Sequence, residues 1–336
     1  MAQRTDWVDY AKGLGIILVV YAHLLSSGFH AHLPIQEHFF FLSDSIVYSF
    51  HMPLFFFLAG LFAEKSYKKR GARNFLVNKV KFIVYPYLLW SFLQASIELV
   101  FANQSHRGVQ LADIMAIPYL PFSQFWFLYA LVLMFLSYAL LSQFARFAPL
   151  AMITVAGVLF FCPINTEILA LHGFSTGFIF FVSALLAKEY LGNFAKNSIQ
   201  TGSTCVLFFL LIGSGWYIFE RAIEPTRLTD GSHPLYFLYL AGLGISFCIG
   251  LAQYLAEKKY CSVVKVFGTY SLQIYLVHML AGVAVRIVLL NFFSIENPFL
   301  HMVIGVSAGL LVPIGLYKIT LKFNFPYLFE MRQKIH

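Results

Sequence analysis

Residues 8–28 read VDYAKGLGIILVVYAHLLSSG and decide the class of fold. Apart from Asp9, Lys12 and His23, the stretch consists of aliphatic, aromatic and small side chains. The hydrocarbon core of a bilayer is about 30 Å thick and needs about 20 such residues in a helix. The stretch therefore predicts a helix that crosses a membrane.

The composition of the whole chain extends this prediction to most of its length. Of the 336 residues, 60% are hydrophobic, 18% are aromatic and only 11% are charged, and the mean hydropathy is +0.75. A soluble globular protein is about 45–50% apolar and about 25% charged. Soluble enzymes, disordered chains and fibrous proteins are therefore excluded. We expect an all-α, polytopic membrane helix bundle that forms a single domain over residues 1–336.

Apolar runs bounded by charged or turn residues predict ten transmembrane helices. Their predicted ranges are 8–28, 45–63, 82–102, 123–142, 149–170, 174–191, 199–219, 235–256, 267–290 and 298–317. No cleavable signal peptide is evident, because charged residues precede the first apolar run and no small-residue cleavage site follows it.

The positions of Lys and Arg predict the orientation of the chain. Residues 29–44 carry no Lys or Arg, whereas residues 64–81 carry seven. Basic residues remain on the cytoplasmic side of a membrane. With ten helices and both termini in the cytoplasm, only four of the 23 basic residues lie at outer ends, namely Arg107, Arg221, Arg227 and Arg286. The net charge of +8 thus points to a multi-pass protein of the cytoplasmic (inner) membrane, surrounded by lipid, and not to a nucleic-acid partner.

The first predicted helix carries two ionisable side chains, Lys12 and His23. Such groups inside a membrane are costly and mark functional sites by default. The eleven-residue separation brings His23 to within about 20° of Lys12 around the helix and about 16 Å further along it. One face therefore presents a cation near the inner surface and an imidazole in the outer half of the bilayer.

The second predicted helix brings two more candidates to the depth of His23. It starts near Asp44 and carries His51 about two turns further on. An imidazole suits a general base, and a carboxylate can hold its tautomer. We therefore predict that His23, Asp44 and His51 form a catalytic group. The alternative is that the histidines only satisfy neighbouring backbone carbonyls.

Arg70 and Arg73 are candidates for binding a phosphorylated ligand at the inner surface. On a helix or turn, a spacing of three places both guanidinium groups on one side, where they can bind phosphate in a bidentate manner. Lys12 would add a third cation to this cofactor-binding group. The alternative is an ordinary basic loop without a ligand. A phosphate-binding site inside and a base far across the bilayer require a long, thin ligand.

Three further residues are predicted to bind substrate. Glu98 lies near the outer end of the third predicted helix, Trp126 near the start of the fourth, and His278 within the ninth. A residue such as Trp126 more often belongs to the aromatic belt at the membrane interface than to a site, and Glu98 could pair with a histidine or simply lie at this interface. The four cysteines have no metal-ligand spacing, and no metal is expected.

Five motifs in order resemble those of the membrane acyltransferase-3 family of bacterial O-acyltransferases. They are DYAKGLGI at 9–16 with VYAH at 20–23, FHMPLFFFLAG at 50–60, RGAR at 70–73 with YPY at 85–87, FWFL at 125–128, and GTYS at 268–271 with IY at 274–275 and His278. The resemblance covers residues 9–278, which is most of the chain.

The resemblance implies an integral-membrane enzyme that transfers an acyl group, commonly acetyl, from cytoplasmic acyl-CoA. The implied acceptor is a sugar hydroxyl of an exopolysaccharide or a lipid-linked glycan, and no cofactor is bound permanently. The essential histidine of the family corresponds to His23, its basic partner to Lys12, and its acyl-CoA-binding arginines to Arg70 and Arg73. A second step would require partners such as polysaccharide-assembly proteins.

The residues and the resemblance together predict a mechanism in which His23 takes the proton of the acceptor hydroxyl. Asp44 or Glu98 would orient His23, and His51 would polarise the carbonyl or bind the sugar. A transient acyl-histidine remains an alternative, as do succinyl and other short acyl groups. Two other classes of function remain open at this point: a transporter or flippase for a sugar or lipid-linked intermediate, and a scaffold subunit.

Overall fold

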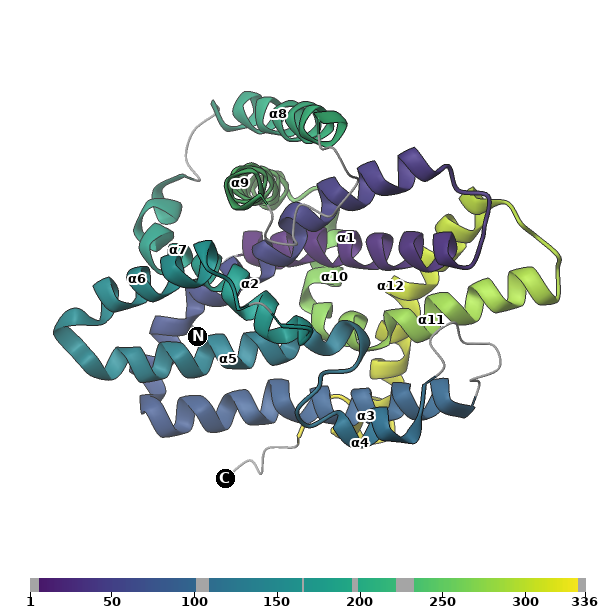
Figure 1. The fold of residues 1–336 in the computed structure, drawn as a ribbon, viewed down its shortest axis with the longest axis horizontal. Helices are drawn as coiled ribbons and strands as arrows, with labels where there is room; N and C mark the ends of the chain where they lie inside the picture. Colours follow the sequence, from purple (N-terminus) through teal and green to yellow (C-terminus); the bar gives the residue numbers. More distant parts are fainter. Residues whose placement is uncertain (1–5, 101–108, 165, 195–198, 222–232, 332–336) are drawn as a thin grey trace. The chain divides into compact units, whose positions relative to one another are not determined.

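The computed structural model describes residues 6–100, 109–164, 166–194, 199–221 and 233–331 (Figure 1). Every regular element in these ranges is helical. The α-helices are α1 Asp6–His30, α2 Glu37–Lys79, α3 Tyr85–Val100, α4 Leu111–Ala116, α5 Trp126–Leu141, α6 Ala148–Phe161, α7 Leu169–Phe194, α8 Ile199–Arg221, α9 Pro234–Lys258, α10 Ser262–Thr269, α11 Ser271–Asn291 and α12 Pro298–Lys322. The all-α fold class is confirmed.

Eight helical segments among the described residues are long and apolar enough to cross a bilayer. One of them, Glu37–Val100, contains two of the ten predicted helices, and α6 is a shorter apolar helix. A polytopic helix bundle is therefore confirmed, whereas the number ten stays a prediction. Both chain ends, as well as Arg107 and Arg227, lie outside the described residues.

The chain divides into two compact units. The first unit holds the residues up to Leu58 together with Leu186–Ile314, and the second holds Ala59–Leu185 with Gly315 and the residues after it. In the first unit, α1 packs against α9, α10 and α11 (Figure 1). The helix with the two predicted ionisable groups is thus enclosed by helices from the C-terminal half of the chain.

Two glycines allow α10 to approach the first half of α1. A Cβ atom added at Gly268 would lie 1.6 Å from the backbone oxygen of Asp9, and one added at Gly13 would lie 1.9 Å from the backbone oxygen of Val264. At the edge of this contact, Lys265 Nζ lies 2.8 Å from Asp6 Oδ2. The hydrogen bond to Asp6 raises the pKa of Lys265, so the lysine keeps its charge as the pH rises. The backbones of the two helices therefore touch around Lys12.

Aromatic packing organises the second unit. The rings of Phe75, Phe135, Tyr138 and Phe181 contact one another at centroid distances of 5.4–6.2 Å. Such edge-to-face and tilted contacts stabilise a core beyond the area that the rings bury. This cluster joins the end of α2 to α5 and α7.

The helix α2 changes direction at Gly71, which has φ 71° and ψ 163°. Only glycine adopts this conformation readily. The basic stretch that separates two predicted transmembrane helices is itself helical on both sides of this residue. It continues through a π-helical turn, Val80–Val84, into α3. The two flanking helices of the sequence prediction are thus joined by a kink and not by a loop.

Candidate functional site

The rings of His23 and His278 lie next to each other in the first unit. Their centroids are 5.3 Å apart and their planes are inclined by 49°. His23 projects from α1, His278 projects from α11, and these two helices pack together. A Cβ atom at Gly282 would lie 2.2 Å from Cδ2 of Leu24, so the missing side chain at this position leaves room for the leucine where the helices meet. The structure therefore brings together two candidates that lie 255 residues apart in the chain.

The contacts of His278 define its tautomer. This side chain is fully buried, and its Nδ1 lies 2.8 Å from the backbone oxygen of Tyr275 and 3.1 Å from that of Ile274. Because a carbonyl oxygen only accepts hydrogen bonds, Nδ1 carries the proton and Nε2 carries a lone pair. Among the described residues, Nε2 has no hydrogen-bond partner. A buried acceptor is thus available beside His23.

Tyr48 connects the histidine pair to His51. Its ring centroid lies 6.2 Å from that of His23 and 4.7 Å from that of His51, with nearly perpendicular planes in both cases. His51 Nδ1 donates to the backbone oxygen of Val47 at 2.7 Å. Sequence reasoning missed Tyr48, although its position one turn before His51 on the same helix could have indicated it.

Asp44 and Lys12 lie further from the histidine pair along their helices. Asp44 is buried one turn before Tyr48 on α2. Lys12 is partly buried on α1, which runs without interruption through His23. The prediction that one continuous helix carries Lys12 and His23 is confirmed.

A family model described as an acyltransferase domain matches residues 5–318. The chain belongs to the acyltransferase-3 family. No curated protein and no solved structure matches it. The matched range contains His23, His278 and all other candidate residues. The family and the apolar helices together make the protein a membrane acyltransferase, and this favours the enzyme over the transporter and scaffold interpretations.

In this acyltransferase, Arg70 and Arg73 stand on either side of the kink at Gly71 in the second unit. Both side chains are exposed, and Arg70 Nη1 donates to Ser66 Oγ at 2.7 Å. Because Gly71 is not helical, the two arginines do not share one continuous helical face, and a shared side across a turn stays a prediction. Both guanidinium groups are exposed and lie close to Gly71. They can therefore still form the paired hydrogen bonds that bind phosphate.

Glu98 belongs to a polar cluster in the second unit. Its Oε1 accepts a hydrogen bond of 2.9 Å from Nε2 of Gln94, and Gln94 also exchanges two amide hydrogen bonds with Gln124. Both glutamines are buried. Sequence reasoning missed them because it considered only ionisable side chains.

Trp126, the last candidate, packs against Gly173 in the second unit. A Cβ atom at Gly173 would lie 2.3 Å from the indole ring.

The arrangement around His23 suits proton transfer within the acyltransferase. A neutral imidazole can take a proton from a hydroxyl group, and a neighbouring acceptor stabilises the imidazolium that results. His278 Nε2 is such an acceptor, and the ring of Tyr48 lies edge-on to that of His23. The site therefore has the components of general-base catalysis.

Proposed function

We propose that this protein transfers an acetyl group from cytoplasmic acetyl-CoA to a sugar hydroxyl of an exopolysaccharide or a lipid-linked glycan, with His23 as the general base. The observation that carries the proposal is the pair of imidazoles, His23 and His278, 5.3 Å apart inside a membrane acyltransferase. A solvent-accessible hydrolase would not need its base inside an apolar helix, where the cost of a polar group is high.

The proposed reaction is a direct transfer. His23 takes the proton of the sugar hydroxyl as the oxygen attacks the thioester carbonyl of acetyl-CoA. The tetrahedral intermediate collapses, the C–S bond breaks, and the CoA thiolate leaves and takes up the proton that His23 held. His278 accepts a hydrogen bond from the His23 imidazolium during this sequence. His51 is proposed to polarise the carbonyl or bind the sugar, with Tyr48 beside it, and Asp44 is proposed to orient His23.

The donor is proposed to bind through its phosphates to Arg70 and Arg73, with Lys12 as a further cation. Guanidinium groups form paired hydrogen bonds with phosphate, whereas the ammonium of Lys12 acts as a point charge. Glu98 and Trp126 are proposed to bind substrate. The protein is proposed to lie in the inner membrane, where donor and acceptor reach it from opposite sides, together with partners that assemble the polysaccharide.

The test uses the full chain in lipid nanodiscs with acetyl-labelled acetyl-CoA and a glycan extract as acceptor. Replacing His23→Ala is expected to lower label transfer by a factor of about 10²–10⁴, the usual contribution of a general base. The same variant should bind acetyl-CoA normally. His38→Ala serves as a matched control, because His38 is exposed and pairs with Glu220.

A double variant, Arg70→Gln with Arg73→Gln, separates donor binding from chemistry. It is expected to weaken acetyl-CoA binding in a titration while leaving the fold intact, since both side chains are exposed. Undiminished transfer by His23→Ala would remove the proposed base. Transfer of label to a protein residue in the absence of acceptor would replace direct transfer with an acyl-enzyme route.

A further inference from the structure

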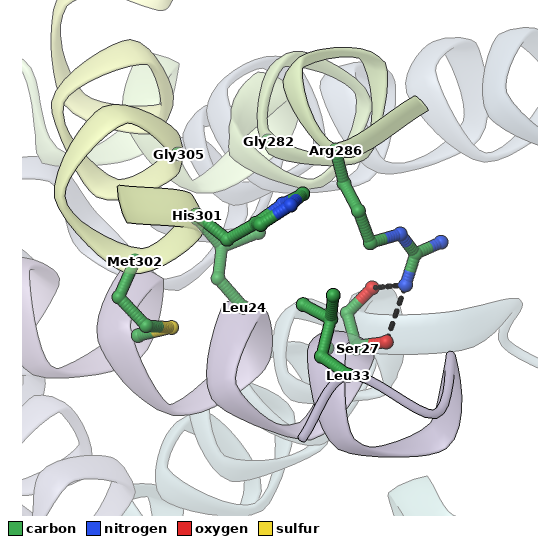
Figure 2. A pocket seen from close by; sticks show the side chains of 9 residues that line it. Leu24, Ser27, Leu33, Gly282, Arg286, His301, Met302 and Gly305 are labelled. Atoms are coloured by element: carbon green, nitrogen blue, oxygen red, sulfur yellow. Dashed lines mark hydrogen bonds between the residues drawn. The ribbon is translucent and has the colours of Figure 1, made fainter. Parts of the chain in front are cut away.

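A second group of polar side chains surrounds a pocket at the end of α1 opposite to Lys12. The pocket is small, is partly open, and lies within the first unit. Its polar lining consists of Ser27 on α1, Arg286 on α11 and His301 on α12. Figure 2 shows Arg286 extending from α11 to Ser27, with the imidazole of His301 directed into the same space.

Only part of the hydrogen-bonding capacity of the Arg286 guanidinium is used in this pocket. Its Nη1 donates to the backbone oxygen of Ser27 and, at 2.8 Å, to Ser27 Oγ. The backbone oxygen of Ser27 also accepts the N–H of Ala31, so the end of α1 does not depend on the arginine. A guanidinium has five N–H donors. Within the described part of the chain, no carboxylate pairs with this cation.

His301 supplies the complementary acceptor. Its Nε2 lies 2.7 Å from the backbone oxygen of Ile295, and this nitrogen therefore carries the proton. Its Nδ1 carries a lone pair, is buried and has no hydrogen-bond partner among the described residues. The whole side chain is only 6% exposed. A buried acceptor without a partner destabilises the fold, and a ligand with a hydroxyl group would supply the missing partner.

We propose that Arg286, Ser27 and His301 bind a ligand that carries an acidic group, a phosphate or a carboxylate, next to a hydroxyl. Arg286 would pair with the acidic group and His301 Nδ1 would accept the hydroxyl proton in a hydrogen bond. Because the pocket is small and partly open, it would hold the acidic group and the neighbouring hydroxyl while the rest of the ligand lies outside it. Both acidic sugars and glycerol-bearing phospholipid headgroups have this chemistry.

The position of the pocket links it to the proposed acyl acceptor. Ser27 lies four residues beyond His23 on α1, which is about 6 Å along the helix. Arg286 lies eight residues beyond His278 on α11. A sugar whose acidic group is held by Arg286 would therefore extend toward the histidine pair. This last step rests on the proposed function, and it makes the acceptor an acidic glycan.

The experiment titrates the full chain in phosphatidylcholine nanodiscs with glucose 1-phosphate, glucuronate and neutral glucose, using calorimetry. The two acidic sugars are expected to bind at least about tenfold more tightly than glucose. Arg286→Gln should weaken their binding about 10- to 100-fold, and Arg286→Lys should be intermediate. Arg221→Gln is the matched control, because Arg221 is an exposed arginine that lies over the ring of Tyr217.

Thermal unfolding of each variant without ligand shows whether the fold is retained, and Ser27→Ala provides a second, milder change in the same site. Equal binding of glucose and glucose 1-phosphate would overturn the proposal, as would unchanged binding of acidic sugars by folded Arg286→Gln.

Nanodiscs with phosphatidylglycerol distinguish a sugar from a lipid headgroup as the source of the acidic group. If phosphatidylglycerol weakens the binding of the acidic sugars and this effect requires Arg286, the site binds a lipid headgroup. If phosphatidylglycerol has no effect, the site binds a sugar.

The outcome is independent of the acetyl-transfer assay. If acidic sugars bind through Arg286 but no His23-dependent transfer occurs, the proposed function fails and the site stands. If acetyl transfer proceeds normally and Arg286→Gln binds acidic sugars as the unaltered protein does, the proposed acidic-ligand site is refuted while the proposed function is retained.

Discussion

At the scale of single residues, His278 has an environment that fixes which of its nitrogens can act. Backbone oxygens of Ile274 and Tyr275 hold the proton on Nδ1, and Nε2 is left to accept beside His23. In the proposed mechanism His278 is a positioning residue, because it would act through His23. The substrate contact that the sequence predicts for His278 stays a prediction.

The His278→Ala variant is expected to lower kcat for acetyl transfer about 10- to 100-fold, by analogy with the hydrogen-bond partners that orient metal-ligating histidines. The dissociation constant for acetyl-CoA should not change. His278→Gln should recover part of the rate, since its amide oxygen reaches about the position of Nε2. A purely structural role would instead lower the melting temperature of both variants and would give no recovery with Gln. Steady-state kinetics and thermal unfolding together distinguish the two cases.

At the scale of elements, the contact between α1 and α10 depends on the absence of a side chain at Gly268. A methyl group there would meet the backbone oxygen of Asp9 at 1.6 Å, and backbone cannot rotate away as a side chain can. Gly268→Ala is expected to destabilise the protein by about 1–3 kcal/mol. The measurement is the melting temperature of the purified protein in detergent.

Gly242→Ala is the matched control for this substitution. Gly242 lies on α9, and nothing surrounds its missing Cβ within 4 Å. Alanine in a helix is favoured over glycine by about 1 kcal/mol, so this variant should melt at the same temperature or higher. Equal melting temperatures for the two alanine variants would contradict the tight contact between α1 and α10.

The helical content and the approximate position of each apolar helix follow from the sequence, because the bilayer imposes length and apolarity on each crossing. The first and last residues of each helix are predicted less accurately. The prediction began the second helix at residue 45, whereas α2 begins at Glu37 and continues into the basic stretch. Basic side chains suit both loops and helices at a membrane surface, and only the backbone of Gly71 reveals where the chain turns.

The candidate site was predictable in part. His23 stands out as an ionisable group in an apolar helix, and its proximity to the helix with His51 was expected. The contact with His278 was not, because hydrophobic periodicity says nothing about which of ten helices are neighbours. Gln94 and Gln124 were missed, since neutral amides are common in sequences and their mutual hydrogen bonds appear only in the fold.

At the scale of the whole molecule, the distribution of basic residues predicts which surfaces face the cytoplasm, and two native cysteines can test it. Cys162 follows α6 and Cys261 precedes α10, and both are exposed. With the chain ends in the cytoplasm, Cys162 lies outside and Cys261 inside. In variants that retain one of the two, with the other cysteines changed to serine, an impermeant maleimide should label intact cells only through Cys162.

Labelling of Cys261 should appear after the cells are permeabilised, and a variant without cysteines provides the background. Labelling of Cys261 but not Cys162 in intact cells would reverse the predicted orientation. It would also place the arginine pair on the side of the membrane that has no acyl-CoA.

The enclosure of α1 by α9, α10 and α11 has a consequence for the biogenesis of the protein. The first helix leaves the ribosome long before its neighbours exist, and about 250 residues at about 5–20 residues per second take roughly 12–50 s. Throughout this interval the imidazole of His23 has no α11 against which to pack. The segment that enters the bilayer first therefore acquires its native surroundings last, and a chain truncated before residue 271 would never protect it.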